Sequence, residues 1–251
     1  MSVLLGERRA WPPGRRFWVV HFWLPLLVFA LLAVVFETTP LDLWIADVLF
    51  ALEGGRWTLQ HHWFTYDVMH HYGKLALIAF GLGVLVLAVL SCCLERLKPW
   101  RWPLAYLATG LVLVPATIGF GKHFSDVPCP WDLARYGGED AYRHSLDYAF
   151  GWVGSHSRSC FPAGHAAGGF GLLVVYFAAW PYARRPAWFL LPGLLVGEAF
   201  GLAQQVRGAH FVSHDLWTLA LTWFAALGLF VLFRPARWGG GEARSTGNKK
   251  A

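Results

Sequence analysis

Lysine, arginine and histidine residues stand at the ends of several long apolar segments, and their side chains suit phosphoryl transfer. Lys122 ends one segment, Pro162-Ala163-Gly164-His165 begins another, Arg207 ends a third, and His210 and His214 precede a fourth. Cationic side chains neutralise phosphate oxygens, and backbone N–H groups at a helix start bind anions. One imidazole can attack phosphorus while a second protonates the departing oxygen. Together these residue types predict a phosphoryl-transfer site that works without a metal.

Each of these residues also has a plainer explanation. A lysine at the end of a membrane span often extends its ammonium group to the interface, and an arginine can simply anchor such an end. A single histidine there often does no more than hydrogen-bond to backbone. The shared site is favoured because four separate helix ends bring these side chains to one membrane depth.

The composition is that of a membrane protein. Of the 251 residues, 56% are hydrophobic and only 14% are charged, whereas a soluble domain has about a quarter charged residues. A membrane-spanning helix needs about 20 apolar residues. We therefore predict one all-α, polytopic membrane domain over residues 1–238 and a disordered tail over 239–251. Its six transmembrane helices are expected at about 17–36, 73–94, 103–124, 161–182, 187–207 and 214–234.

The basic residues predict that both termini lie in the cytoplasm. In that orientation most of the 21 basic residues fall in the inner segments and most of the 15 acidic residues do not, as the positive-inside rule requires. The two long loops, 37–72 and 125–160, then lie outside, and the expected location is a bacterial inner membrane with the site facing the periplasm. Because the net charge of +6 is spread over four inner segments, nucleic-acid binding is not expected.

The cysteines are divided between the two sides of the membrane. Cys92 and Cys93 lie at the inner end of the second span, where thiols stay reduced. Cys129 and Cys160 lie in the outer loop 125–160, where oxidation is permitted. We predict a disulfide between Cys129 and Cys160, with two free buried thiols as the alternative.

Two histidine doublets, His61-His62 and His70-His71, precede the second span. Adjacent side chains on a helix or strand point in different directions. The doublets are therefore expected to lie at the membrane interface rather than to bind a metal.

Three segments resemble, in order, the signature motifs of the type 2 phosphatidic acid phosphatase superfamily of membrane lipid phosphatases. The family pattern is Lys-x6-Arg-Pro, then Pro-Ser-Gly-His, then Ser-Arg-x5-His-x3-Asp. This sequence has Lys122 to Pro130, then Pro162-Ala163-Gly164-His165, then Gln204 to Asp215. The resemblance covers roughly residues 103–234 and implies the six-span fold.

The resemblance implies a role for each matching residue. His210 matches the nucleophile that forms a phosphohistidine intermediate, and His165 matches the acid that protonates the leaving group. Lys122 and the backbone at Gly164 match phosphate contacts. Families of this kind require neither a metal nor another cofactor.

Three departures from the family pattern concern the phosphate-binding groups. Cys129 and Gln204 stand where the motifs have arginine, and Ala163 replaces a serine whose hydroxyl donates to phosphate. Arg207 lies three residues after Gln204, on nearly the same face of a helix. Arg207 is therefore expected to replace the missing guanidinium.

A further departure concerns the group that orients the nucleophile. His214 occupies the aspartate position of the third motif, and Asp215 follows it. A carboxylate normally orients such an imidazole and stabilises its charged form. Either His214 or Asp215 can act in this way on His210, and the register favours His214.

The leading hypothesis is hydrolysis of a lipid phosphomonoester or lipid diphosphate at the outer face of the inner membrane. By the resemblance, the candidate substrates are undecaprenyl diphosphate, phosphatidylglycerol phosphate, phosphatidic acid and lipid A phosphates. One alternative is a lipid phosphotransferase that passes the phosphate to another lipid. The other is a non-catalytic protein that binds or transports lipid phosphates.

Overall fold

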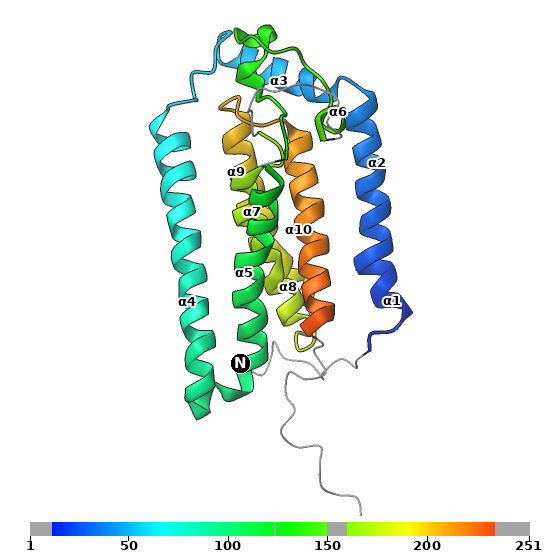
Figure 1. The fold of residues 1–251 in the computed structure, drawn as a ribbon, viewed down its shortest axis with the longest axis vertical. Coiled ribbons are helices and arrows are strands. Elements are labelled where there is room, and N and C mark those ends of the chain that lie inside the picture. The colour runs from blue at the N-terminus through cyan, green and yellow to red at the C-terminus, as the bar shows by residue number, and fades with distance from the viewer. Residues whose placement is uncertain (1–11, 123, 150–159, 234–251) are drawn as a thin grey trace, which may run out of the picture.

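The computed structural model describes residues 12–122, 124–149 and 160–233, and the elements in this part of the chain are helical. Figure 1 shows long helices side by side, with the short helices α3 and α6 together at one end of the bundle. The predicted tail, 239–251, lies outside the described residues. The α-helices are α1 (Arg15–Trp18), α2 (Leu24–Thr38), α3 (Leu41–Leu52), α4 (Gly73–Cys93), α5 (Arg101–Lys122), α6 (Ser145–Ala149), α7 (Gly164–Phe170), α8 (Val174–Ala179), α9 (Leu191–Gln205) and α10 (Val212–Phe233).

Segments of π-helix and of 3-10 helix extend several of these helices. A π-helical segment, Val19–Trp23, joins α1 to α2, and another, Phe64–Tyr72, leads into α4. Tight 3-10 segments, Glu95–Trp100 and Pro186–Leu190, lead into α5 and α9, and Gly171–Leu173 joins α7 to α8. Most of the long helical stretches are therefore longer than the α-helical bounds alone.

Five helical stretches among the described residues are long and apolar enough to cross a membrane. They are Arg15–Thr38, Phe64–Cys93, Glu95–Lys122, Pro186–Gln205 and Val212–Phe233. These helices indicate a membrane protein, so the predicted all-α membrane fold is confirmed. The large apolar side chains along α2 and α4 are mostly exposed, which suits contact with lipid chains.

The segment predicted as the fourth span, 161–182, forms a shorter apolar helix, Gly164–Ala179. The helix begins only after Pro162 and ends before Pro181, and proline cannot continue a helical hydrogen-bond ladder. Most of its residues are buried and none is fully exposed, since α7 packs against α5, α9 and α10. A sixth span of full length is thus not observed in the described part of the chain, and this helix forms the centre of the bundle.

A close approach between glycines places α7 directly against α9. A Cβ atom on Gly169 would lie 2.4 Å from the backbone nitrogen of Gly197, so neither helix leaves room for a side chain there. Small residues allow such backbone contact between membrane helices. The contact fixes the start of α7 beside the end of α9, where the candidate site residues lie.

The described parts of the two predicted outer loops, 37–72 and 125–149, come together at the end of the bundle near α3 (Figure 1). Arg135 donates two hydrogen bonds of 2.6 Å to the carboxylate of Asp47 on α3, and this pairing lowers the pKa of Asp47 below its ordinary value. The backbone N–H of Trp131 donates to the carbonyl of Gly208, at 3.0 Å. Gly208 has a φ of +71° and its Cα faces the ring of Trp57, so a side chain would be strained and obstructed there. These contacts join both loops to the turn between α9 and α10.

Candidate active site

Lys122 at the end of α5 lies against the start of α7. A Cβ atom on Gly164 would lie 3.3 Å from Cε of Lys122 and 3.6 Å from its Nζ. The glycine therefore lets the ammonium group approach the first turn of the helix. Ala163 precedes this turn and donates its backbone N–H to Oγ1 of Thr218 on α10, at 2.8 Å.

His165 presents a nitrogen that is free to meet a ligand. Its Nε2 is buried and has no hydrogen-bond partner among the residues that the structure describes. Lys74, Lys122 and Arg207 lie close enough to interact with this imidazole electrostatically. Because buried polar atoms in proteins are nearly always paired, this atom suits an anionic ligand held among the three cations.

His210 and His214 form a buried pair beside Lys122. Their Nδ1 atoms lie 3.4 Å apart, and both imidazoles interact with the backbone of Cys160. Burial lowers the pKa of His210 well below its ordinary value, and the nearby Lys122 cation acts in the same direction. His210 is therefore a neutral imidazole at neutral pH, which is the form that can act as a nucleophile.

Asp215 faces α9. Its Oδ2 accepts a hydrogen bond of 2.7 Å from Nε2 of Gln205, and the same oxygen would lie 2.7 Å from a Cβ atom on Gly201. His214, by contrast, contacts the His210 ring directly. Of the two predicted orienting residues, His214 is the one that has the geometry for the role.

Arg207 is buried in the turn that follows α9. Its Nη1 donates to Oε1 of Gln204, at 2.9 Å, and its Nε donates to the carbonyl of Gln60, also at 2.9 Å. The guanidinium also lies over the ring of Tyr66, 5.1 Å from the ring centre. Arg207 thus lies beside the motif position that Gln204 occupies, as predicted from their spacing.

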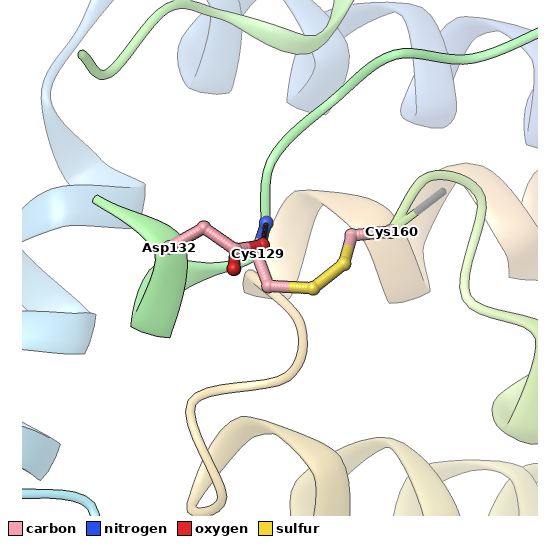
Figure 2. Close-up of side chains that lie close together, drawn as sticks. All are labelled: Cys129, Asp132 and Cys160. Atoms are coloured by element: carbon pink, nitrogen blue, oxygen red, sulfur yellow. Dashed lines mark hydrogen bonds between the residues drawn. A yellow bond between two sulfur atoms is a disulfide. The ribbon is translucent and has the colours of Figure 1, made fainter. Parts of the chain in front are cut away.

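The predicted disulfide is present. Figure 2 shows the bond between Cys129 and Cys160, with Asp132 on the same loop as Cys129. The Cα atoms of the two cysteines are 5.3 Å apart, and the backbone N–H of Cys160 donates to the carbonyl of Val127, at 3.2 Å. Cys129, Asp132 and Cys160 lie close enough together to suggest a metal site. Two sulfurs in a disulfide cannot act as thiolate ligands of a metal, so we interpret the two cysteines as a covalent link. It joins the loop after Lys122 to the segment before His165.

Loss of this disulfide should destabilise the protein and disturb the histidine pair. We expect the Cys129→Ala/Cys160→Ala double variant to lose about 2–4 kcal/mol of stability, measured as a lower Tm in detergent. The control is Cys92→Ala/Cys93→Ala, since both cysteines are exposed and unbonded. If the two double variants unfolded at the same temperature, the stabilising role of the disulfide would be wrong.

A carboxylate from helix α3 binds the start of α10. Oδ1 of Asp42 accepts the backbone N–H of Ser213, at 3.0 Å, one residue before His214. Burial raises the pKa of the Asp42 carboxyl to about 6. The start of the helix that carries His214 is therefore held by a group that titrates near neutral pH, and the sequence carried no signal for it.

Replacing Asp42 with asparagine should remove a pH dependence of stability. Because the pKa of Asp42 is raised from 3.8 to about 6, the folded protein binds this proton more tightly than the unfolded chain. The resulting stabilisation is full below pH 3.8 and is lost as pH rises through about 6. Asparagine cannot ionise but keeps an oxygen for Ser213. The Tm of Asp42→Asn relative to wild type should therefore increase from about pH 4 to about pH 7, whereas parallel Tm curves would contradict the expectation.

The predicted site residues gather at one end of the bundle. Lys122 interacts electrostatically with both His165 and His210, and Arg207 interacts with His165. Ala163 and Gly164 form the start of α7, the helix that carries His165. The side chains come from α5, α7 and the turn between α9 and α10, so segments far apart in the sequence converge there (Figure 1).

Sequence reasoning missed one residue of this group. His70 was expected at the membrane interface, but its ring stacks on that of His165, with the ring centres 3.7 Å apart. The neighbouring His71 is exposed and contacts the ring of Tyr72 instead. The only available signal was the position of His70 at the outer end of a span, at the same depth as the predicted site.

Comparisons with known proteins bear on the same segments. A family model described as the PAP2 superfamily matches residues 103–238, which include all three motif segments. No curated protein and no solved structure matches the chain significantly.

Proposed function

Because the chain belongs to the PAP2 superfamily, whose members are generally phosphatases, we propose that it hydrolyses a lipid phosphomonoester or diphosphate through a phosphohistidine. The observation that carries the proposal is that the imidazoles of His210 and His165 both lie near the ammonium group of Lys122. His210 is neutral and buried, and Nε2 of His165 has no hydrogen-bond partner within the described part of the chain. Both interact with Lys122.

In the first step, a ring nitrogen of His210 forms a bond to phosphorus while the bond from phosphorus to the leaving oxygen breaks. His165 enters this step as an imidazolium beside the bound phosphate anion, gives its proton to that oxygen and becomes neutral, so the lipid leaves as an alcohol or a lipid monophosphate. In the second step, water gives a proton to His165 and attacks phosphorus, and the bond from phosphorus to nitrogen breaks. Orthophosphate leaves, and both histidines return to their starting forms.

The cations and the helix start hold the phosphate oxygens in both steps. Lys122 and the backbone at Gly164 lie together, and a helix N-terminus adds favourable N–H donors. Arg207 supplies the guanidinium of the motif arginine that Gln204 replaces. Ala163, which replaces the motif serine, contributes no hydroxyl. His214 contacts His210 and fixes the orientation of its ring. In this proposal the positive charge comes from side chains, so no metal is needed.

The substrate class follows from the surroundings of the site. The site lies at the end of helices that are long and apolar enough to span a membrane, so a phosphate on a lipid can reach it while the lipid chain stays in the membrane. The positive-inside rule favours a cytoplasmic location for the opposite end, which supports a site facing the periplasm of a bacterial inner membrane. The candidates are undecaprenyl diphosphate, phosphatidylglycerol phosphate, phosphatidic acid and lipid A phosphates.

The test is phosphate release by the purified protein from these four lipids in detergent with a metal chelator. We expect release from at least one lipid in chelator. A requirement for a divalent metal would contradict the proposed chemistry, and binding of the lipids without any release would favour a binding or transport protein. Addition of an acceptor lipid separates hydrolysis from phosphotransfer, since transfer gives a phosphorylated acceptor in place of orthophosphate.

A further inference from the structure

Four side chains form a row along one side of the candidate site. The rings of His70 and His165 have centres 3.7 Å apart and planes 22° apart. The Tyr66 ring lies 5.7 Å from that of His70, with planes 5° apart, and the Arg207 guanidinium lies over Tyr66 at 5.1 Å. The row therefore connects the start of α7 to the turn after α9 through two side chains of the second span.

The backbone at the start of the second span explains this alignment. Tyr66 and His70 belong to the π-helical segment Phe64–Tyr72, and π-helical turns are rare and often found at functional sites. Gly73 then packs directly on α9, since a Cβ atom there would lie 2.7 Å from Cζ of Phe200. The buried Thr65 donates to the carbonyl of Leu59 at 2.5 Å. This segment is thus fixed against the bundle, and His70 is held over His165.

The stack restricts the one ring torsion that a general acid must control. The terminal torsion of a histidine side chain has broad, roughly two-fold minima, so an uncovered imidazole turns easily. Proton transfer to a leaving oxygen needs hydrogen-bond geometry, and small displacements of reacting groups reduce rates strongly. A second ring packed at 3.7 Å leaves His165 little freedom to turn, while its Nε2 stays without a protein partner among the described residues.

We propose that His70 is a positioning residue, whose ring holds the His165 imidazole in the orientation that protonates the leaving oxygen. The proposal rests on the proposed function, in which His165 is the acid. It assigns a role in the site to the second span, which lies outside residues 103–238 matched by the family model.

The experiment compares two substrates that differ in their need for an acid. Phosphatidic acid has an alcohol leaving group that must be protonated, whereas 4-nitrophenyl phosphate releases a weakly basic nitrophenolate. The value of kcat/KM reports the steps up to departure of this group. For His70→Ala we expect a loss on the order of tenfold with phosphatidic acid, part of the ~10²–10⁴-fold effect of a general acid, and little loss with 4-nitrophenyl phosphate.

Three further variants separate ring stacking from other roles of His70. His70→Phe keeps a flat ring and should retain most of the activity. The His70→Ala/His165→Ala double variant should be no slower than His165→Ala, because His70 acts only through His165. His71→Ala is the matched control, since this adjacent histidine is exposed and should behave as wild type.

Several results would overturn the role of His70 alone. They are wild-type kcat/KM in His70→Ala, equal losses with both substrates, a defect in His70→Phe as large as in His70→Ala, or additive losses in the double variant. In each case His165→Ala would still show its dependence on the leaving group. Failure of the wild-type protein to release phosphate from all four candidate lipids and from 4-nitrophenyl phosphate would instead overturn the proposed function, and the role of His70 with it.

Discussion

Replacing His210 with alanine should abolish phosphate release from every substrate, with kcat/KM lower by at least about 10³-fold. The reason is that no phosphoenzyme can form without this imidazole, whatever the leaving group. Burial and Lys122 keep His210 neutral, so the wild-type side chain is ready to attack at neutral pH. Initial rates of orthophosphate release from phosphatidic acid and 4-nitrophenyl phosphate measure the effect.

The control must separate loss of chemistry from loss of structure, because His210 is buried. His210→Asn keeps a polar side chain of similar reach and should be as inactive as the alanine variant. Its elution in size-exclusion chromatography and its Tm should stay close to those of wild type. Unchanged phosphate release in either variant would exclude His210 as the nucleophile.

Replacing His165 with alanine should lower kcat/KM by about 10²–10⁴-fold for a lipid alcohol leaving group. The effect should be much smaller for 4-nitrophenyl phosphate, since nitrophenolate departs without a proton. Because water attack on the phosphohistidine also uses His165, this variant should give a burst of nitrophenolate followed by slow turnover. Stopped-flow absorbance of nitrophenolate measures both phases.

A uniform loss for both substrates would contradict the role of His165 as leaving-group acid and would favour a role in phosphate binding alone. Lys122→Ala provides the comparison for that outcome. Lys122 contacts the start of α7 and interacts with both histidines, so its loss should weaken catalysis on both substrates alike.

The fold was largely predictable because long apolar segments leave few alternatives to membrane helices. Five of the predicted spans reach a membrane-crossing length among the described residues. The segment 161–182 is the exception. Its apolar composition predicts a full span, but Pro162 and Pro181 limit the length of the helix. Its enclosed position, which depends on contacts with α5, α9 and α10, is not visible in hydropathy.

The site was partly predictable because the end of a span fixes the depth of a side chain. This reasoning identified Lys122, His165 and His210, and the same reasoning about depth gave the disulfide, which is confirmed. Depth does not determine which way a side chain faces. Sequence therefore allows both His214 and Asp215 as partners for His210, and only packing shows that Asp215 faces α9.

His70 could not be placed from sequence for a related reason. The usual helical pattern assumes 3.6 residues per turn, whereas the segment before α4 is π-helical. The direction of His70 also depends on how Gly73 packs against Phe200. Asp42 is a similar case, since its contact with Ser213 joins residues that are far apart in the chain.

The most direct measurement is to trap the enzyme during turnover and locate the phosphate. Wild-type protein and the His165→Ala variant would be mixed with 4-nitrophenyl phosphate, quenched in alkali and analysed by peptide mass spectrometry. We expect an alkali-stable, acid-labile phosphate on His210, in greater amount in the His165→Ala variant and absent from His210→Ala. Active protein with phosphate on another residue, or with none at any stage of turnover, would contradict this expectation.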